Sequence, residues 1–358
     1  MPPRLRLGVL TWYKGTQMEE RTFFTHLVKE AEKLNTEILL FSPHDILPSG
    51  MIRALVYQKD RGGWQSKLSS PPDLVYDRFR NMEPKAFKSF IHFRSGSKMK
   101  FINSRLAHKW NLHCYLDRHP TIRKWLPETL FLEGSADIKR LLGKYHQVYL
   151  KPVNGTGGKG ILSITQKSGH LALLGRDWQR KKMKRTIPLS SLATFVSDWT
   201  KDKKYIVQQG LKLQWEPHVM VDFRLLVQKD AAGEWKVTGM GGKVGGKDSA
   251  TSNLHGGGKA VDAEQILGKY FPPEKYQKQM AECHQLGLLI AEYLEEKFGR
   301  LVELGIDLGI DQDGAIWIIE VNPKPGRDIF RLMGNMNLYW TAVRRPIEYA
   351  LYVFREEG

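Results

Sequence analysis

The chain has 358 residues, of which 41% are hydrophobic and 26% are charged, and its formal net charge is +17. This length can bury a substantial core and predicts a globular protein of two or three lobes. No apolar run approaches the ~18 residues that a spanning helix needs, so we expect no membrane span. Residues 1–6 lead directly into a predicted strand without a signal-peptide core, so we expect a cytoplasmic protein. The composition does not predict an oligomeric state.

The first hundred residues alternate between strand and helix patterns. Strands are predicted over residues 5–11, 37–42 and 74–79, and a 3.6-residue apolar period predicts an amphipathic helix over 19–34. This order is typical of a small open α/β sheet.

Asp77 and Arg78 stand at the end of the third predicted strand. Open α/β sheets bind ligands just past the carboxyl ends of their strands. These two residues therefore either contact a substrate or form a local ion pair.

Helical patterns follow over residues 84–117, with a break at 95–97, and over residues 135–145. The two cysteines, Cys114 and Cys283, lie far apart in helical patterns. We expect two buried, reduced thiols rather than a disulfide.

A glycine-rich segment joins two predicted strands in the middle of the chain. Residues 148–153 form a strand that carries Lys151, residues 154–160 read Asn-Gly-Thr-Gly-Gly-Lys-Gly, and residues 161–164 resume the strand pattern. Backbone N–H groups of such a loop can cover phosphates, and Lys151 would add positive charge nearby. The alternative is a plain turn, which is common for glycine-rich hairpins.

A dense basic run extends from Arg176 to Arg185. Six of its ten residues are Lys or Arg, and Asp177 is the single acid. Such a run either contacts a polyanion or forms a solvated loop or helix face.

The remainder of the chain is predicted to contain a turn at residues 230–235, a long loop at 239–258, and helices at 273–298 and 340–354. The long loop contains Ser252, Asn253 and Leu254, and long loops in compact domains are often functional.

Polar residues interrupt two very apolar strands near the end of the chain. Asp307 lies on the first strand, a turn follows at residues 311–314, and Glu320 and Asn322 lie two apart on the second strand. Residues two apart share one strand face, and Asp307 can reach that face. Three hard oxygen donors suit Mg²⁺. The alternative is a surface hairpin with a polar side.

In this order the motifs resemble those of the ATP-grasp superfamily, in particular its endospore coat-associated YheC/YheD-like family, over roughly residues 100–330. The resemblance implies an ATP-grasp fold, with a preliminary α/β domain over residues 1–100, an N-lobe over 101–206 and a C-lobe over 207–358. It also implies ATP and Mg²⁺ (or Mn²⁺) as cofactors, bound between the two lobes.

The resemblance further implies roles for particular residues. Arg224 and Lys151 would be catalytic, and Asp307, Glu320 and Asn322 would hold the metal. The residues implied to bind nucleotide are Lys109, Lys151, Gly155, Thr156, Gly157, Gly158, Lys159, Gly160, Gln208, Gln209, Glu216 and Asn253. The chain departs from the family pattern at Gln208 and Gln209, where Glu is common, and at Lys243 and Lys247, where a related ligase has arginines.

The implied function is an ATP-dependent ligase that joins a small-molecule or peptide carboxylate to an amine or a thiol through an acyl phosphate. The implied setting is the cytoplasm or the endospore coat. Two alternatives stay open: a spore-associated nucleotide-binding or structural protein without ligase activity, and a kinase on the same fold.

Overall fold

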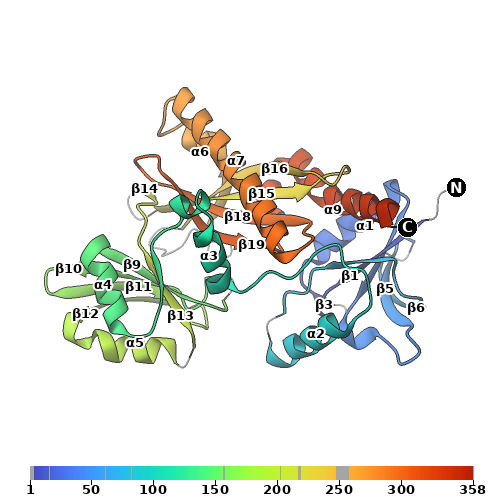
Figure 1. The fold of residues 1–358 in the computed structure, drawn as a ribbon, viewed down its shortest axis with the longest axis horizontal. Coiled ribbons are helices and arrows are strands. Elements are labelled where there is room, and N and C mark those ends of the chain that lie inside the picture. The colour runs from blue at the N-terminus through green and yellow to red at the C-terminus, as the bar shows by residue number, and fades with distance from the viewer. Residues whose placement is uncertain are drawn as a thin grey trace.

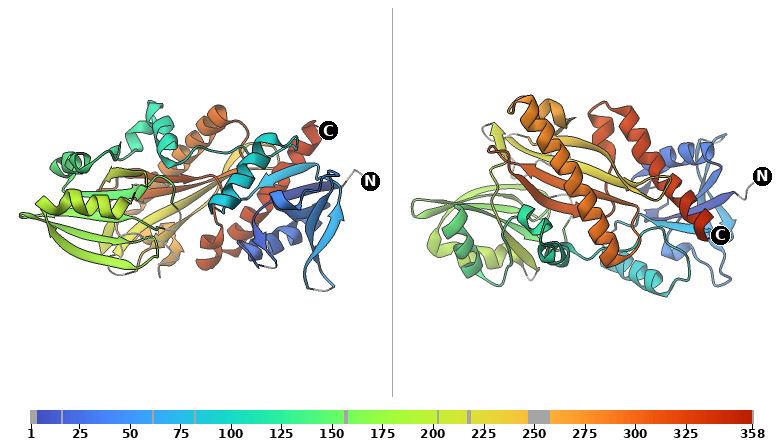
Figure 2. Two further views of the ribbon diagram at one scale, coloured as in Figure 1. Left: turned by 90° about the horizontal axis from the view of Figure 1, so that it is seen from below. Right: turned by 45° about the horizontal axis from the view of Figure 1, so that its top comes forward.

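The computed structural model describes residues 4–15, 17–60, 62–81, 83–155, 158–201, 203–216, 219–246 and 258–357. Three large β-sheets organise these residues (Figure 1). The N-terminal sheet and the second sheet lie at opposite ends of the molecule, with the third sheet between them (Figure 2).

The N-terminal sheet has the strand order β6-β5-β4-β1-β7. Its central strands β4, β1 and β7 are parallel, and β5 and β6 add an antiparallel edge. The apolar face of α1 covers one side of the sheet, and α2 covers the other, so the predicted open α/β sheet is confirmed. The elements of this region are β1 (Leu5–Leu10), β2 (Tyr13–Lys14), β3 (Gln17–Met18), α1 (Arg21–Lys33), β4 (Thr36–Phe41), η1 (Pro43–Asp45), β5 (Ile52–Gln58), β6 (Gly63–Ser69), β7 (Leu74–Asp77) and α2 (Pro84–Gly96).

The second sheet is antiparallel, with the order β12-β11-β10-β9-β13-β8. Helices α4 and α5 pack their apolar residues on one face of it. The break predicted at residues 95–97 begins later, at Ser97, because α2 continues through Gly96, and it extends to residue 108, since a separate helix, α3, begins at Lys109. The elements are α3 (Lys109–Arg118), η2 (Ile122–Trp125), β8 (Thr129–Phe131), α4 (Ser135–Tyr145), β9 (Gln147–Pro152), β10 (Leu162–Lys167), β11 (His170–Arg176), β12 (Lys182–Pro188), η3 (Leu189–Ser191), α5 (Leu192–Thr200) and β13 (Tyr205–Gln209).

The third sheet runs β17-β16-β15-β18-β19, and β14 pairs with β15. Helix α7 buries its predicted apolar stripe against one face of this sheet. Helices α8 and α9 share a core with the N-terminal sheet and with Leu226 of β15. The elements are β14 (Gln214–Glu216), β15 (Val219–Lys229), β16 (Trp235–Val244), β17 (Lys259–Asp262), α6 (Ala263–Leu267), α7 (Pro273–Phe298), β18 (Glu303–Ile310), β19 (Ile316–Asn322), α8 (Asp328–Leu332) and α9 (Met336–Glu357).

The long loop predicted at residues 239–258 is wrong in its first part. Strand β16 continues to Val244 and pairs with β15 throughout. Its glycines reflect close packing: a Cβ on Gly241 would lie 2.9 Å from Ile329, and a Cβ on Gly242 would lie 2.1 Å from Ile266. Residues 247–257 lie outside the described part of the chain.

Residues 177–181 of the basic run lie in a loop, as its composition indicated, but the rest of the run lies on strands, which was not predicted. Its residues form the end of β11, a turn, and the start of β12. Strand β12 is largely exposed, so no apolar alternation marks it in the sequence.

The two remaining predictions are that both cysteines are reduced thiols and that no helix spans a membrane. Cys114 is partly buried and Cys283 is buried, and both are free thiols, as expected. Among the residues that the structure describes, no helix combines the length and the apolar character that crossing a membrane requires.

Candidate functional site

Three neighbouring strands of the third sheet bring the predicted metal-site residues together. Arg224 of β15 is paired in register with Asp307 of β18, and Asp307 is paired with Glu320 of β19. Asn322 lies two residues beyond Glu320, and its amide Nδ2 donates to Asp307 Oδ2 over 3.3 Å. The convergence predicted for Asp307, Glu320 and Asn322 is therefore present in the fold, while metal binding by these residues stays a prediction.

The Asp307 carboxylate lies at the centre of this cluster. Arg224 donates to it through Nε (2.6 Å) and Nη2 (2.9 Å), and Lys243 Nζ donates over 3.0 Å. Burial alone would raise the pKa of Asp307, but Arg224 and then Lys243 lower it well below its usual range. Lys243 also pairs with Asp222 over 2.6 Å. Asp307 is thus held ionised at neutral pH.

Two lysines approach this cluster from outside the third sheet. Lys109, at the start of α3, forms an ion pair with Glu320 over 3.1 Å. Lys151, on β9, donates to Gln208 Oε1 over 2.5 Å. Burial, and after it the like charge of Lys109, lowers the pKa of Lys151 to about 8. The negative charges of Glu320, Asp222 and Asp307 oppose these two effects and raise the pKa of Lys151. The two lysines and the carboxylates therefore share one electrostatic environment between the second and third sheets.

The glycine-rich segment between β9 and β10 is described at Gly155 and from Gly158 to Gly160; Thr156 and Gly157 lie outside the described residues. Gly160 has φ +70°, the left-handed region that favours glycine. A Cβ there would lie 2.8 Å from the Tyr205 hydroxyl and 3.0 Å from the Trp178 ring, and Trp199 Nε1 donates to the Gly160 carbonyl over 3.2 Å. Three aromatic side chains thus hold the end of the segment. That the segment covers phosphates stays a prediction.

The residues predicted to surround the adenosine lie at the ends of β13 and β14. The Gln208 side chain bonds to Lys151 and Thr129, and Gln209 accepts the Glu128 backbone N–H over 3.1 Å. The exposed Glu216 accepts the Tyr270 hydroxyl over 3.1 Å. The side chains of Gln208 and Gln209 therefore both form hydrogen bonds with other groups of the protein. Asn253 lies outside the described residues.

Asp77 and Arg78 form the local ion pairs that were the alternative to substrate contact. Arg78 is buried and bonds to Glu303 over 2.6 Å and to Glu20. Asp77 accepts from Lys324 over 2.6 Å. Arg78 also donates to the carbonyl of Pro325, three residues after Asn322, over 3.0 Å. Residues at the end of strand β7 of the N-terminal sheet therefore bond to the segment that follows the predicted metal-binding strand.

Among the described residues, no group of three or more His, Cys, Asp and Glu side chains could hold a metal ion. The candidate set consists of two carboxylates and one carboxamide. The sequence analysis missed the contact of Lys243 with Asp307. Lys243 lies in the segment that was predicted to be a loop, and no pattern in the sequence indicated that it is on a paired strand.

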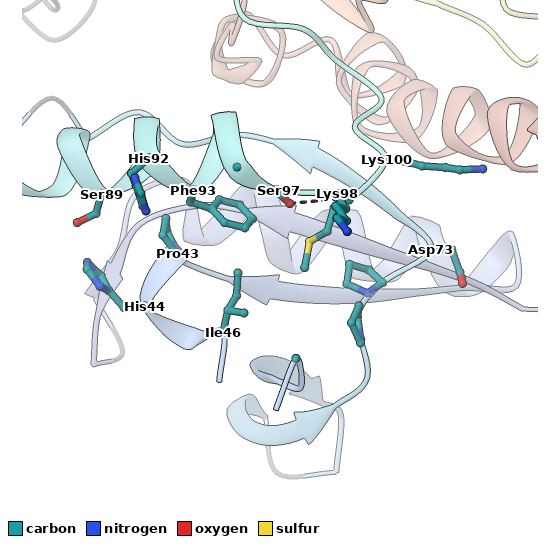
Figure 3. Close-up of a pocket in the computed structure, with 15 residues that line it drawn as sticks. Pro43, His44, Ile46, Asp73, Ser89, His92, Phe93, Ser97, Lys98 and Lys100 are labelled. Atoms are coloured by element: carbon teal, nitrogen blue, oxygen red, sulfur yellow. Dashed lines mark hydrogen bonds between the residues drawn. The ribbon is translucent and has the colours of Figure 1, made fainter. Parts of the chain in front are cut away.

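A cavity of about 900 Å³ lies elsewhere, beside α2 in the N-terminal region. His92 and Phe93 of α2, Pro43 and Ile46 after β4, and Lys98 line it (Figure 3). None of the residues predicted to bind nucleotide or metal is among the residues that line this cavity.

The fold of the chain is similar to that of solved ligases. The D-cycloserine synthetase DcsG matches with TM-score 0.60 and 12% identity, covering 96% of this chain and 98% of that chain. D-alanine–D-alanine ligase from Bacillus anthracis matches with TM-score 0.57 and 13% identity, covering 99% and 100%. The ATP-grasp ligase PsnB, solved with a phosphomimetic variant of its minimal precursor, Mg and ADP, matches with TM-score 0.53 and 13% identity, covering 96% and 98%. At these identities the likeness shows the fold alone.

Two curated relatives come from Bacillus subtilis (strain 168). The endospore coat-associated protein YheD is 29% identical over 340 residues, which are 92% of this chain and 74% of that protein. The endospore coat-associated protein YheC is 27% identical over 357 residues, which are 96% and 95% of the two chains. The family model described as YheC/D like ATP-grasp matches residues 98–353. Because that match spans well over half of the chain, and because the motifs and the fold agree with it, the protein belongs to the YheC/D-like ATP-grasp family.

Proposed function

We propose that this protein is an ATP-dependent ligase that joins a substrate carboxylate to an amine or a thiol through an acyl phosphate. The observation that carries the proposal is the cluster around Asp307. It combines hard oxygen donors with four cationic side chains, which are Lys109, Lys151, Arg224 and Lys243. Such a cluster suits the phosphates of a nucleotide and the charge that develops during phosphoryl transfer. Two of the solved proteins of similar fold, PsnB and the Bacillus anthracis protein, are named as ligases, which favours the same class of reaction.

The donor set fits a divalent cation. Asp307 is held ionised, and the Glu320 side chain keeps 30% of its surface exposed next to Lys109. Asn322 already donates to Asp307 through Nδ2, so its amide oxygen is the atom that would serve as a ligand. Asp307, Glu320 and Asn322 would therefore hold Mg²⁺ (or Mn²⁺), which would neutralise phosphate charge on bound ATP.

The chain's own residues would position the reactants. Lys109 and Lys151 would bind the phosphates as point charges. Arg224 uses Nε and Nη2 for Asp307, which leaves Nη1 to steady the transferring phosphoryl group. The substrate carboxylate would attack the γ-phosphorus, with ADP leaving, and the amine or thiol would then displace phosphate. The segment from Gly155 to Gly160 would exclude water from the acyl phosphate.

The adenosine would lie at the ends of β13 and β14. Because the side chains of Gln208 and Gln209 bond within the protein, adenine would be contacted through backbone groups, and Glu216 would reach the ribose. We also infer an association with the endospore coat from the two curated relatives that carry that description.

The reaction class can be tested by measuring ADP and phosphate release across pools of amino acids, peptides and cell-wall precursors. A ligase releases both products only in the presence of its acid and its nucleophile. Release of ADP with a phosphorylated product and without free phosphate would identify a kinase. Binding of Mg-ATP without release in any pool would identify a nucleotide-binding protein.

Mg-ATP is expected to stabilise the folded protein. A ligand present at 100 times its dissociation constant adds about 2.7 kcal/mol to the free energy of unfolding. Thermal unfolding with and without millimolar Mg-ATP measures this effect, with Mg²⁺ alone as the control. An unchanged unfolding temperature would contradict nucleotide binding.

The affinity for ATP is expected to fall above pH 8. Lys151 has a pKa of about 8 in the folded protein, so it loses its positive charge as the pH rises through that value. One pH unit above this pKa, the Lys151 side chain stays charged in about a tenth of the molecules, and the affinity for ATP falls by up to about tenfold. Lys151→Arg keeps the charge and is expected to bind ATP equally at pH 7 and pH 9. Titration of ATP at both values separates the two proteins, and a flat profile for the wild type would rule out a role for the Lys151 charge.

The same pKa predicts the effect of Lys151 on stability. The pKa of Lys151 in the folded protein lies below the ordinary lysine value of 10.5. Burying the charged side chain therefore lowers the free energy of unfolding at all pH values below about 8. This cost is relieved as the pH rises from 8 towards 10.5. Neutral Lys151→Met is therefore expected to lose this pH dependence of the free energy of unfolding.

A further inference from the structure

Lysine side chains of the basic strand β12 lie on the same face of the second sheet as the Lys151 side chain. Side chains alternate between the faces of a strand, so Tyr149 and Lys151 of β9 share one face. The register continues outward from Tyr149 through Ser163 and Leu174 to Lys184. Helices α4 and α5 cover the opposite face, against which Val148 and Leu150 are buried.

Lys182 and Lys184, two apart on β12, therefore project from the Lys151 face of the sheet. Three strand spacings of about 4.8 Å put β12 roughly 14 Å from β9. Lys181, Lys182 and Arg185 are exposed. The single acid of the run, Asp177, uses its carboxylate to accept the backbone N–H groups of Gln179 and Lys181, so it stabilises the turn.

The turn between β11 and β12 contacts the glycine-rich segment. The Gly160 N–H donates to the Asp177 carbonyl over 3.4 Å, and the Arg176 N–H donates to the Ile161 carbonyl over 3.0 Å. The basic strand and the segment beside Lys151 are therefore parts of one connected surface. A ligand on β12 would lie next to the candidate site rather than remote from it.

Strand β12 is the last strand of its sheet. Alternate N–H and C=O groups of an antiparallel edge strand point away from its partner, and no other strand pairs with them in the part of the chain that the structure describes. Lysines on an edge strand can simply prevent aggregation. Here, however, the exposed Lys181 and Lys182 lie where β12 begins, and Lys182 projects from the Lys151 face of the sheet.

The chemistry of the run favours a peptide over a nucleic acid. Single-stranded nucleic acids need aromatic rings on which bases stack. The one aromatic residue of the run, Trp178, packs against Gly160 and lies under Lys203, whose Nζ is 4.9 Å from the ring centroid. An extended peptide needs instead the open backbone edge that β12 offers.

We propose that the edge of β12 binds an extended acidic peptide, which adds a strand to the second sheet and pairs its carboxylates with Lys181 and Lys182 at the start of β12. Resting on the proposed function, such a peptide is the class of substrate whose carboxylate reaches the site near Lys151.

The binding step is tested without nucleotide. The probe is a fluorescein-labelled peptide of seven residues, the length of β12, in which Glu and Thr alternate. Fluorescence anisotropy is expected to show binding that weakens with salt. The double variant Lys181→Ser, Lys182→Ser is expected to bind about fivefold more weakly, since each exposed pair contributes modestly.

Three controls make the outcome decisive. Lys29→Ser and Lys139→Ser together remove the same charge from exposed positions on α1 and α4, and this variant is expected to bind like the wild type. A peptide with Gln in place of Glu is expected not to bind. A Glu-Thr peptide N-methylated at alternate residues keeps its charge but cannot pair with an edge, so it is expected to bind at least about tenfold more weakly.

Equal binding by the double variant and the wild type would overturn the proposal, as would equal binding of the N-methylated peptide. Tighter binding of a single-stranded oligonucleotide of the same charge would assign the surface to nucleic acid instead. Mg-ATP stabilisation is measured separately on the same proteins. Failure of peptide binding and failure of nucleotide binding are therefore seen independently.

Discussion

Replacing Glu320 with Gln is expected to lower metal-dependent ADP formation by at least about 100-fold. The carboxylate lies on β19 opposite Asp307, and in the structure it pairs with Lys109 over 3.1 Å. The amide has nearly the same shape but lacks the charge that would hold a divalent cation. The fold is expected to stay intact because the side chain is 30% exposed and neutralising it leaves no buried ion behind.

Initial rates of ADP formation across a Mg²⁺ titration measure the effect, and circular dichroism checks the fold. The matched control is Glu296→Gln, which neutralises the carboxylate of a surface ion pair with Lys297 and is expected to keep full activity. If Glu320→Gln unfolded, with unchanged nucleotide affinity per folded molecule, the residue would have a structural role and not a metal-binding one.

Replacing Arg78 with Met is expected to destabilise the protein by about 3–5 kcal/mol, because it removes the buried cation that pairs with the carboxylates of Glu303 and Glu20. The Arg78 side chain is fully buried and bonds to Glu303, which is also fully buried, and to Glu20. Glu303 keeps Arg327 and Gln228 as partners, but Glu20 would keep just Arg80, at 3.2 Å, among its ion-pair partners in the described residues.

Urea unfolding measures this change as a difference in the free energy of unfolding. Lys59→Met breaks the exposed pair with Glu32 and serves as the control, with an expected change of about 0–1 kcal/mol. Arg78→Lys keeps the charge but loses the fork that reaches two carboxylates, so its stability should lie between those of the wild type and Arg78→Met. A loss below about 1 kcal/mol for Arg78→Met would show that this buried network contributes little to stability.

Much of the candidate site was predictable because its signals are local. The spacing of Glu320 and Asn322 on one apolar strand, with Asp307 across a short turn, already implied that the three side chains converge. The family follows from the order of the motifs. The roles of individual residues and the domain limits at residues 100 and 206 stay predictions.

What the sequence did not reveal depends on long-range packing. The contact of Lys243 with Asp307 was missed because glycines that permit close packing on β16 resemble the glycines of a loop. The pairing of Arg78 with Glu303 joins residues 225 positions apart, and no local pattern encodes such a pair. Strand β12 was missed because Met183 and Ile187 are the two apolar residues that mark its buried side before Pro188, too few for a recognisable apolar alternation.

Helix α9 has a consequence for synthesis of the chain. It packs on α1 and the N-terminal sheet in one shared core, and both ends of the described chain lie on the same side of the molecule (Figure 1). The ribosome makes β1 and α1 long before it makes residues 336–357. The nascent N-terminal sheet therefore waits, with the apolar surface that α9 will cover still open, until those residues have emerged. The second sheet shares no core with α9, so it is free to fold as soon as β13 has emerged.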